Sequence, residues 1–248
     1  MLAAVNVSKR YNTYEGVFNS SDTSFLAVNN VSLTLKEGES IGIVGQSGCG
    51  KTTLAKILAG IISPEQGEVL YKGVPYKEAA EYRKNVQMVF QNPDQSLNPR
   101  LRVKSVLYDL LSMRYSGRRE IYNESVRLME MVGLSEDYLD RYPVELSGGQ
   151  KQRVSIARSL ALEPEVIIAD EPVSGLDVSV QAQILNLLAE LKGRGITYIF
   201  ISHDLSVVSW LCDRVVVMYA GEIVEDGEVE AVMRSPKHEY TKKLMVLL

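Results

Sequence analysis

The chain has 248 residues, of which 46% are hydrophobic and 23% charged, which is enough for one large α/β domain with a substantial core. Its formal net charge of −4 argues against a nucleic-acid-binding surface, which would be basic. Two cysteines, Cys49 and Cys212, are too few for a disulfide scaffold or a four-ligand metal site. No secretory signal and no run of roughly 18 apolar residues is found. We therefore expect a chain that is soluble by itself and serves any membrane process by docking onto other subunits.

Short apolar or alternating segments predict the strands of the fold. Residues 41–44, 166–169 and 197–202 are almost wholly apolar, as expected of parallel strands covered on both faces. The alternating segment 28–35 and a hairpin over 219–225 indicate antiparallel strands beside that parallel core. Further strands are predicted at 3–7, 68–71, 86–90 and 214–218.

The strand at 41–44 is followed by the phosphate-binding pattern GQSGCGKT, residues 45–52, and by a helical pattern over 51–59. Glycines in this loop let backbone N–H groups approach a polyphosphate, and the helix adds its positive N-terminal end. Lys51 is expected to reach the terminal phosphates and Thr52 to bind Mg²⁺ through its hydroxyl. The other nucleotide-binding candidates are Gly45, Gln46, Ser47, Gly48, Cys49, Gly50 and Thr53.

Two alternatives remain open for this loop. It is either a phosphate cradle or a glycine-rich turn with a chance lysine, and the strand and helix on either side favour the cradle. Cys49 is either a small space-filling residue or a redox-sensitive thiol near a helix N-terminus. We expect the space-filling role.

The strand signal disappears between residues 91 and 160, where helical periodicity runs through 103–113 and 119–132. This pattern predicts an inserted helical lobe. The polar stretch 12–24 is predicted to be a surface loop between the first two strands. No second phosphate loop is present in the sequence, so one chain carries one nucleotide-binding module.

The apolar run 166–169 ends in Asp170 and Glu171, which places adjacent carboxylates at the carboxyl edge of a buried strand. Such a pair is suited to hold Mg²⁺ and to polarise an attacking water as a general base. An acidic pair after a strand is equally suited to cap the next helix. His203, after the strand at 197–202, is open to a structural or a functional interpretation.

The pentapeptide LSGGQ, residues 146–150, follows the phosphate loop in the same chain. Together they resemble the ATP-binding cassette of ABC transporters, and the similarity extends over nearly the whole chain. The resemblance implies an α/β fold: a P-loop NTPase cassette with a RecA-like parallel core, an antiparallel β subdomain and an inserted α-helical subdomain. It implies one domain over 1–248, with the core and β subdomain in 1–90 and 161–248 and the helical subdomain at about 91–160. ATP and Mg²⁺ are the implied cofactors.

The resemblance assigns roles to single residues. Asp170 and Glu171 look like a Walker B motif, in which Asp170 would hold Mg²⁺ through water and Glu171 would act as the general base. Gln91 matches the Q-loop, where it would sense Mg²⁺ and the attacking water, although a glutamine at a strand end usually means little. Residues 174–177 match the D-loop, which ends in Asp177, and His203 matches the switch histidine near the γ-phosphate.

In the family, LSGGQ faces the nucleotide bound to a partner cassette. Ser147, Gly148, Gly149 and Gln150 would therefore contact ATP across a head-to-tail dimer. Tyr11 is the candidate for the aromatic residue that stacks on adenine. Tyr14 and Phe18 lie close to it in the sequence, and a strand-end tyrosine without that role is the alternative.

Several segments look like the oligopeptide, dipeptide and nickel branch of ABC importers. They are GQSGCGKTTLAK, VFQNPDQSLNPR, ADEPVSGLDVSVQAQILNLL and SPKHEYTKKL. This branch implies a second ATPase subunit, in a heterodimer or a homodimer, two transmembrane permease subunits and, indirectly, an extracytoplasmic substrate-binding protein. It places the chain peripherally on the cytoplasmic face of the cell membrane, with no nucleic acid as partner.

The substrate stays open between peptides, nickel, a metallophore and another small solute. Many peptide-transporting members continue past the SPKHEYT-like segment with a cysteine-containing extension, whereas this chain stops at Leu248. Two other classes are alternatives. A soluble ABC ATPase acting on DNA or ribosomes would typically carry a coiled-coil insertion, metal-binding cysteines or tandem cassettes. An exporter cassette would lack the importer-like tail.

Overall fold

The computed structural model describes residues 1–13 and 23–246, which divide into two compact units. Unit 1 comprises Met1–Tyr82 and Ile199–Leu248, and unit 2 comprises Arg83–Tyr198. Helix α2 (Tyr82–Asn85) and strand β8 (Thr197–Ile201) contain the points at which the chain passes between the units. None of the helices in the described ranges is long and apolar enough to cross a membrane.

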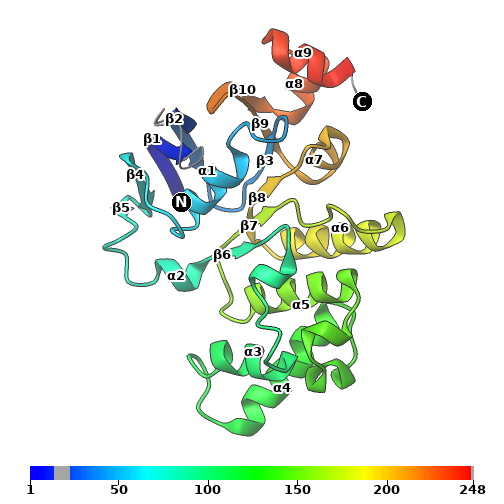
Figure 1. Ribbon diagram of the computed structural model, residues 1–248. Coiled ribbons are helices and arrows are strands. Elements are labelled where there is room, and N and C mark those ends of the chain that lie inside the picture. The colour runs from blue at the N-terminus through cyan, green and yellow to red at the C-terminus, as the bar shows by residue number, and fades with distance from the viewer. Residues whose placement is uncertain (14–22, 247–248) are drawn as a thin grey trace, which may run out of the picture. The chain divides into compact units, whose positions relative to one another are not determined.

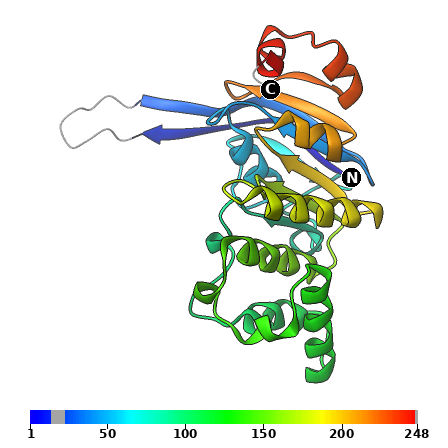
Figure 2. The same ribbon diagram turned by 90° about the vertical axis from the view of Figure 1, so that its right-hand side faces the viewer.

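Unit 1 contains a four-stranded antiparallel sheet of order β2-β1-β4-β5. Strands β1 (Leu2–Thr13) and β2 (Thr23–Leu35) form a long two-stranded ribbon (Figure 2). The predicted loop over 12–24 is therefore wrong at both ends, because Asn12 pairs with Ser24 and Thr13 with Thr23. Backbone pairing places these polar residues in strands, and their sequence lacks the hydrophobic alternation from which a strand is predicted. Residues 14–22, with Tyr14 and Phe18, lie outside the described residues.

A second group of strands in unit 1 contains one parallel pair and one antiparallel pair. β3 pairs in parallel with β9, and β9 pairs antiparallel with β10. The hairpin between β9 and β10 turns at Ala220 (φ 48°) and Gly221 (φ 86°), as predicted, and two left-handed residues are what a tight hairpin turn requires. The remaining elements of unit 1 are β3 (Ser40–Val44), α1 (Lys51–Leu58), β4 (Gln66–Tyr71), β5 (Val74–Pro75), α7 (Leu205–Leu211), β9 (Arg214–Tyr219), β10 (Glu222–Glu228), α8 (Val229–Arg234) and α9 (Glu239–Val246).

Unit 2 combines a parallel strand pair with a group of helices. Strand β6 pairs in parallel with β7, whose residues are all buried. Helices α3, α4 and α5 pack against one another (Figure 1), and residues 91–160, all described, contain no strand. The elements of unit 2 are β6 (Val86–Val89), α3 (Val103–Leu111), α4 (Arg118–Met131), α5 (Gly148–Leu160), β7 (Val166–Asp170), α6 (Val178–Gly193) and the short 3-10 helices η1 (Pro93–Gln95), η2 (Glu136–Asp140) and η3 (Pro143–Glu145).

The apolar runs read from the sequence are the buried strands of the structure. Every residue of β3, β7 and β8 is buried, as expected of strands covered on both faces. The predicted α/β class, with parallel and antiparallel pairing, is confirmed.

Candidate functional site

The phosphate loop follows β3 and leads into α1, as the sequence predicts. Its first glycine, Gly45, has φ 153°, and a Cβ there would collide with the carbonyl oxygen of Met218 on β9. Gly50 has φ 109°, and a Cβ there would collide with the carbonyl oxygen of Ala27 on β2. Glycine is therefore required at both positions by backbone conformation and by close approach of neighbouring strands.

One hydrogen bond holds the loop against the hairpin of β9 and β10, and a second joins the same hairpin to β2. The N–H of Gly221 donates to the carbonyl of Cys49 at 3.0 Å, and the N–H of Asn29 donates to the carbonyl of Gly221 at 2.9 Å. The turn of the hairpin thus bridges the loop and strand β2.

Lys51 is 5% exposed, and its ammonium donates to the carbonyl oxygens of Gly45 (2.7 Å) and Gln46 (3.0 Å). These bonds close the loop on itself. In contrast, Gln46, Ser47 and Gly48 form the exposed tip of the loop. The structure therefore presents an exposed backbone turn with a buried cation beneath it, which is an arrangement suited to a bound polyphosphate.

Cys49 is buried in the loop, with 6% of its surface exposed. Burial raises the pKa of its thiol, and the nearby Lys51 only partly opposes this shift. A raised pKa disfavours the reactive thiolate. Its environment therefore supports the space-filling interpretation over redox sensing.

His203 follows β8, next to the strand that precedes the phosphate loop. The N–H of Ser202 donates to the carbonyl of Ile43 on β3 at 3.2 Å, which aligns the two strand ends. Asp204 then caps α7, because its side chain accepts the N–H groups of Ser206 and Val207. His203 is exposed between these two fixed points, close in the fold to the start of the phosphate loop.

Tyr11 lies on β1, where it is 41% exposed and has Lys9 Nζ 5.9 Å from its ring centroid. Phe25 is its direct partner on β2 and is 50% exposed. Sequence reasoning missed Phe25, because the pairing of the two strands across residues 14–22 was not predicted. The exposed aromatic surface in this part of unit 1 is thus shared by two rings.

In unit 2, Gln91 and Glu171 meet at the carboxyl edge of the parallel pair. Val89 pairs with Ala169, so the residues two positions further along each strand lie side by side. The Gln91 amide donates to the Glu171 carboxylate at 3.2 Å and to the Ser174 hydroxyl at 3.5 Å. The structure therefore brings the predicted Q-loop glutamine and the predicted general base into contact.

Asp170 and Glu171 differ sharply in environment although they are neighbours. Asp170 is the last residue of β7 and is 2% exposed. Glu171 has φ 43°, a left-handed conformation that is rare for a residue with a side chain. No helix begins at this pair, since α6 starts at Val178 with Asp177 as its N-cap. The helix-cap interpretation of the acidic pair is therefore wrong, and the left-handed turn marks it as a site under constraint.

The chain on both sides of Gln91 is bonded to helix α5, which carries the signature LSGGQ at its start. Lys151 forms an ion pair with Asp94 at 2.9 Å, and the hydroxyls of Ser96 and Ser155 are 2.9 Å apart. The buried Gln152 amide donates to the carbonyl of Phe90 at 3.3 Å. Three successive anchors thus couple the position of Gln91 to that of α5.

Ser147 is the N-cap of α5 and forms a capping box with Gln150. The Gln150 N–H donates to the Ser147 hydroxyl at 3.3 Å, and the Ser147 N–H donates to the Gln150 side-chain oxygen at 2.9 Å. The Gln150 amide also donates to the Tyr138 hydroxyl at 3.0 Å, a contact that the sequence did not predict. This network fixes the positive N-terminal end of a 13-residue helix, where Ser147 and Gly148 are exposed.

The two signature glycines have different surroundings. A Cβ on Gly149 would lie 2.5 Å from Cγ1 of Val180 on α6, whereas a Cβ on Gly148 would meet Leu176 at an ordinary 3.5 Å. The signature therefore packs against the segment that contains Asp177. Gly149 is required here by the close approach of α5 to α6.

The residues assigned to magnesium supply oxygen ligands only. Thr52 offers a hydroxyl, Gln91 an amide oxygen and Asp170 a carboxylate, and oxygen is the ligand type that Mg²⁺ prefers. Over residues 1–13 and 23–246, no group of three or more His, Cys, Asp or Glu side chains is placed to hold a metal. This donor set fits an ion that is bound by few protein groups together with phosphate oxygens and water.

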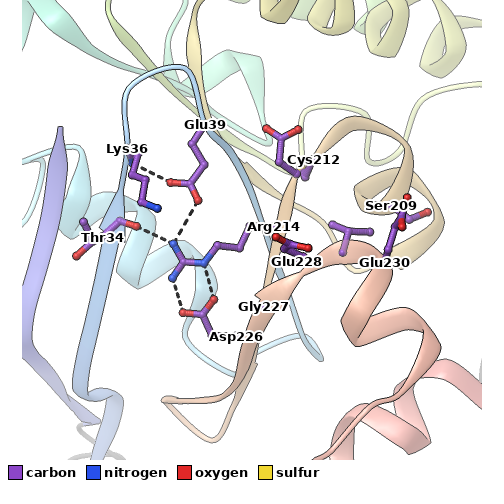
Figure 3. A pocket seen from close by; sticks show the side chains of 12 residues that line it. Thr34, Lys36, Glu39, Ser209, Cys212, Arg214, Asp226, Gly227, Glu228 and Glu230 are labelled. Atoms are coloured by element: carbon purple, nitrogen blue, oxygen red, sulfur yellow. Dashed lines mark hydrogen bonds and ion pairs between the residues drawn. The ribbon is translucent and has the colours of Figure 1, made fainter.

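A separate pocket of about 1080 Å³ in unit 1 contains none of the predicted site residues (Figure 3). At its centre, Arg214 donates twice to the carboxylate of Asp226, once to Glu39 at 3.3 Å and once to the Thr34 carbonyl at 2.9 Å. The guanidinium is thereby occupied by groups of its own chain. It ties β9 to β10 and to the end of β2, which is a structural role.

Comparison with known proteins identifies relatives of this chain. The profile of the family described as "ABC transporter" matches residues 28–174. The dipeptide transport ATP-binding protein DppF of Haemophilus influenzae is 44% identical over 99% of this chain and 77% of its own length. The oligopeptide transport ATP-binding protein AppF of Bacillus subtilis is 44% identical over 97% of this chain and 75% of its own.

Solved structures give the same result for the fold. A dimeric ATP-binding cassette in a post-hydrolysis state, bound to ADP and Pi, has a TM-score of 0.81 and 30% identity, and the match covers 92% of this chain and 99% of that one. A second solved structure, cbiO1 from Clostridium perfringens, is described as part of the ABC transporter complex cbiONQ. It has a TM-score of 0.77 and 31% identity, and the match covers 94% of this chain and 90% of that one.

Proposed function

Because this chain belongs to the ABC transporter family, we propose that it is the ATP-hydrolysing subunit of an importer that carries peptides. The observation that carries the proposal is the contact of Gln91 with Glu171 at the carboxyl edge of β6 and β7. This contact joins a candidate general base to the segment that is fastened to the signature helix. An ATPase that drives movement needs such a connection between its chemistry and a mobile element.

The phosphate loop binds the ATP polyphosphate. Backbone N–H groups of Ser47, Gly48 and Gly50 and the start of α1 surround the phosphates. Gly45, Gln46, Cys49 and Thr53 complete the cradle. Two N–H groups of the Lys51 ammonium stay on the carbonyls of Gly45 and Gln46, and the third donates to the terminal phosphates. Tyr11 stacks on adenine, and the exposed Phe25 opposite it offers a second ring for the same contact.

Thr52, Gln91 and Asp170 would hold Mg²⁺, Asp170 through a water, and the ion would supply neutralisation of the phosphate charge. Glu171 polarises the water that attacks the terminal phosphorus, and ADP and phosphate are released. Gln91 orients Glu171 and the attacking water relative to each other. His203 donates a hydrogen bond to the γ-phosphate. The buried position of Asp170 and the constrained turn at Glu171 support these assignments.

The signature acts on a nucleotide held by a second cassette. Ser147, Gly148, Gly149 and Gln150 present the N-terminus of α5 to the γ-phosphate across a head-to-tail dimer, and Asp177 lies at the same contact. The solved relative with a TM-score of 0.81 is itself described as dimeric. The partner cassette is a second ATPase subunit of the importer, in a heterodimer or in a homodimer.

The transport partners follow from the family. Two transmembrane permease subunits receive the motion of the Q-loop segment, and an extracytoplasmic binding protein delivers the substrate. The chain acts peripherally at the cytoplasmic face of the membrane. Peptides are the proposed substrate, in preference to nickel or another small solute, because the relatives at 44% identity are named for dipeptide and oligopeptide transport.

The test is Glu171→Gln, which keeps the size of the side chain and an oxygen that accepts from Gln91, but removes the base. We expect ATP binding to persist and hydrolysis to slow by at least ~10²-fold. Glu190→Gln, on the exposed part of α6, is the matched control and should leave turnover unchanged. Phosphate release and nucleotide binding are measured on both variants. Unchanged hydrolysis in Glu171→Gln would remove Glu171 from the role of base.

A further inference from the structure

Tyr240, on helix α9, contacts the backbone of the phosphate loop through its side-chain hydroxyl. Its hydroxyl accepts a hydrogen bond from the backbone N–H of Gln46 at 2.7 Å, across 194 positions of sequence. The ring is 9% exposed and packs on Tyr219, with 4.4 Å between the ring centroids. Neither the nucleotide-binding residues nor the catalytic residues assigned above include any part of α9.

The peptide group that joins Gly45 to Gln46 is held at both edges. Its carbonyl oxygen, on Gly45, accepts from the Lys51 ammonium at 2.7 Å, and its N–H, on Gln46, donates to Tyr240 at 2.7 Å. The peptide bond is trans, so these two groups point in opposite directions. Tyr240 therefore lies on the side of the loop away from Lys51, and it does not compete for the phosphates that Lys51 would bind.

Helix α9 is itself anchored to strand β10. The carboxylate of Glu225 accepts the N–H groups of Lys237 (2.8 Å) and His238 (3.1 Å), and His238 Nδ1 accepts the N–H of Tyr240 (3.1 Å). The same hairpin reaches the loop through the bond from Gly221 to Cys49. The C-terminal segment thus supports the phosphate loop at two separate points.

We propose that Tyr240 is a positioning residue for nucleotide binding, which fixes the Gly45–Gln46 peptide in the orientation that directs its carbonyl to Lys51. The inference rests on the proposed function, since it presumes that the loop binds a nucleotide. Without the hydroxyl, the N–H of Gln46 loses its partner and only the bond from Lys51 to the Gly45 carbonyl holds this peptide, which can then tilt more widely. The fraction of loops in the binding-competent shape falls, and the apparent Kd rises in proportion.

The experiment compares Tyr240→Phe with Tyr219→Phe. Both remove one hydroxyl from the same pair of stacked rings, but only Tyr240 bonds to the loop. We expect the Kd for a fluorescent ATP analogue with Mg²⁺ to rise about 2- to 10-fold in Tyr240→Phe, the range for one lost hydrogen bond, and to stay unchanged in Tyr219→Phe. Amide hydrogen exchange at Gln46, followed by NMR, should accelerate in Tyr240→Phe alone.

The outcomes separate the two proposals. A wild-type chain that fails to bind the ATP analogue would refute the proposed function. A wild-type chain that binds normally, with the same Kd and the same Gln46 exchange rate in Tyr240→Phe, would overturn the positioning role. Equal weakening in both variants would also overturn it, because the effect would then come from ring packing. The exchange measurement does not require catalytic activity, so it reads the loop directly.

Discussion

Replacing Gly149 by alanine tests why the signature contains a glycine at this position. The added Cβ would lie 2.5 Å from Cγ1 of Val180, a distance at which one of the two atoms must move. Val180 is β-branched and lies in helix α6, so its side chain has essentially one rotamer and cannot swing away. The collision must therefore be relieved by separating α5 from α6.

The size of the effect follows from two opposing terms. Overpacking of this kind costs about 1–3 kcal/mol. Alanine regains up to ~1 kcal/mol of helix propensity over glycine, and less at the second position of a helix. The net loss of stability is about 1–2 kcal/mol. For a chain of this length, each kcal/mol shifts Tm by about 2–4 °C, so Tm should fall by about 2–8 °C.

The assay is thermal unfolding of Gly149→Ala beside two comparison variants. Gly148→Ala makes the same change one residue earlier, where the new Cβ meets Leu176 at 3.5 Å, and it should leave Tm nearly unchanged. Val180→Ala combined with Gly149→Ala removes the collision and should restore most of the lost Tm. Nucleotide-dependent dimerisation of the stabilised double variant then reports whether Gly149 is also needed for close approach to phosphate.

Two results would refute this reasoning. Equal Tm values for Gly148→Ala and Gly149→Ala would show that the approach of α6 does not select glycine. Strict additivity of Gly149→Ala and Val180→Ala would show that the two side chains do not interact, since contacting residues give a coupling energy in a double-mutant cycle.

Two further predictions concern unit 1. Arg214→Met removes all four hydrogen bonds of a guanidinium that is 24% exposed and should cost about 2 kcal/mol in denaturant unfolding. Lys242→Met, in an exposed pair with Glu239, should cost under ~0.5 kcal/mol, and equal losses would contradict the importance of the Arg214 network. Because the pKa of Cys49 is raised, less of its thiol is ionised at pH 8 than in free cysteine. In a Cys212→Ala chain, alkylation of Cys49 should therefore be slower than alkylation of glutathione. The rate should increase as the pH rises above 9. Alkylation as fast as that of glutathione at pH 8 would exclude a buried, protonated Cys49.

Local patterns were sufficient for the phosphate loop, the buried strands and the signature. Glycines at 45 and 50 meet conformational demands that only glycine satisfies, so the loop could be read directly. The sequence placed Gln91 and Glu171 each just after a strand, but their contact was not predicted, because the pairing of β6 with β7 is a tertiary feature. Helix α9 and the extended ends of β1 and β2 were not predicted, because their polar residues lack a clear hydrophobic period.

The sequence by itself determined which chemical groups this chain can bring to ATP, since those groups occur in short motifs whose backbone shape is local. Only the tertiary structure decided what supports them: Tyr240 behind Gln46, Val180 against Gly149 and Tyr138 on Gln150. The sequence does not show which backbone N–H will donate to a tyrosine hydroxyl that lies 194 positions away. That choice is made when strands and helices pack, because packing sets the distances over which a hydrogen bond or a collision acts.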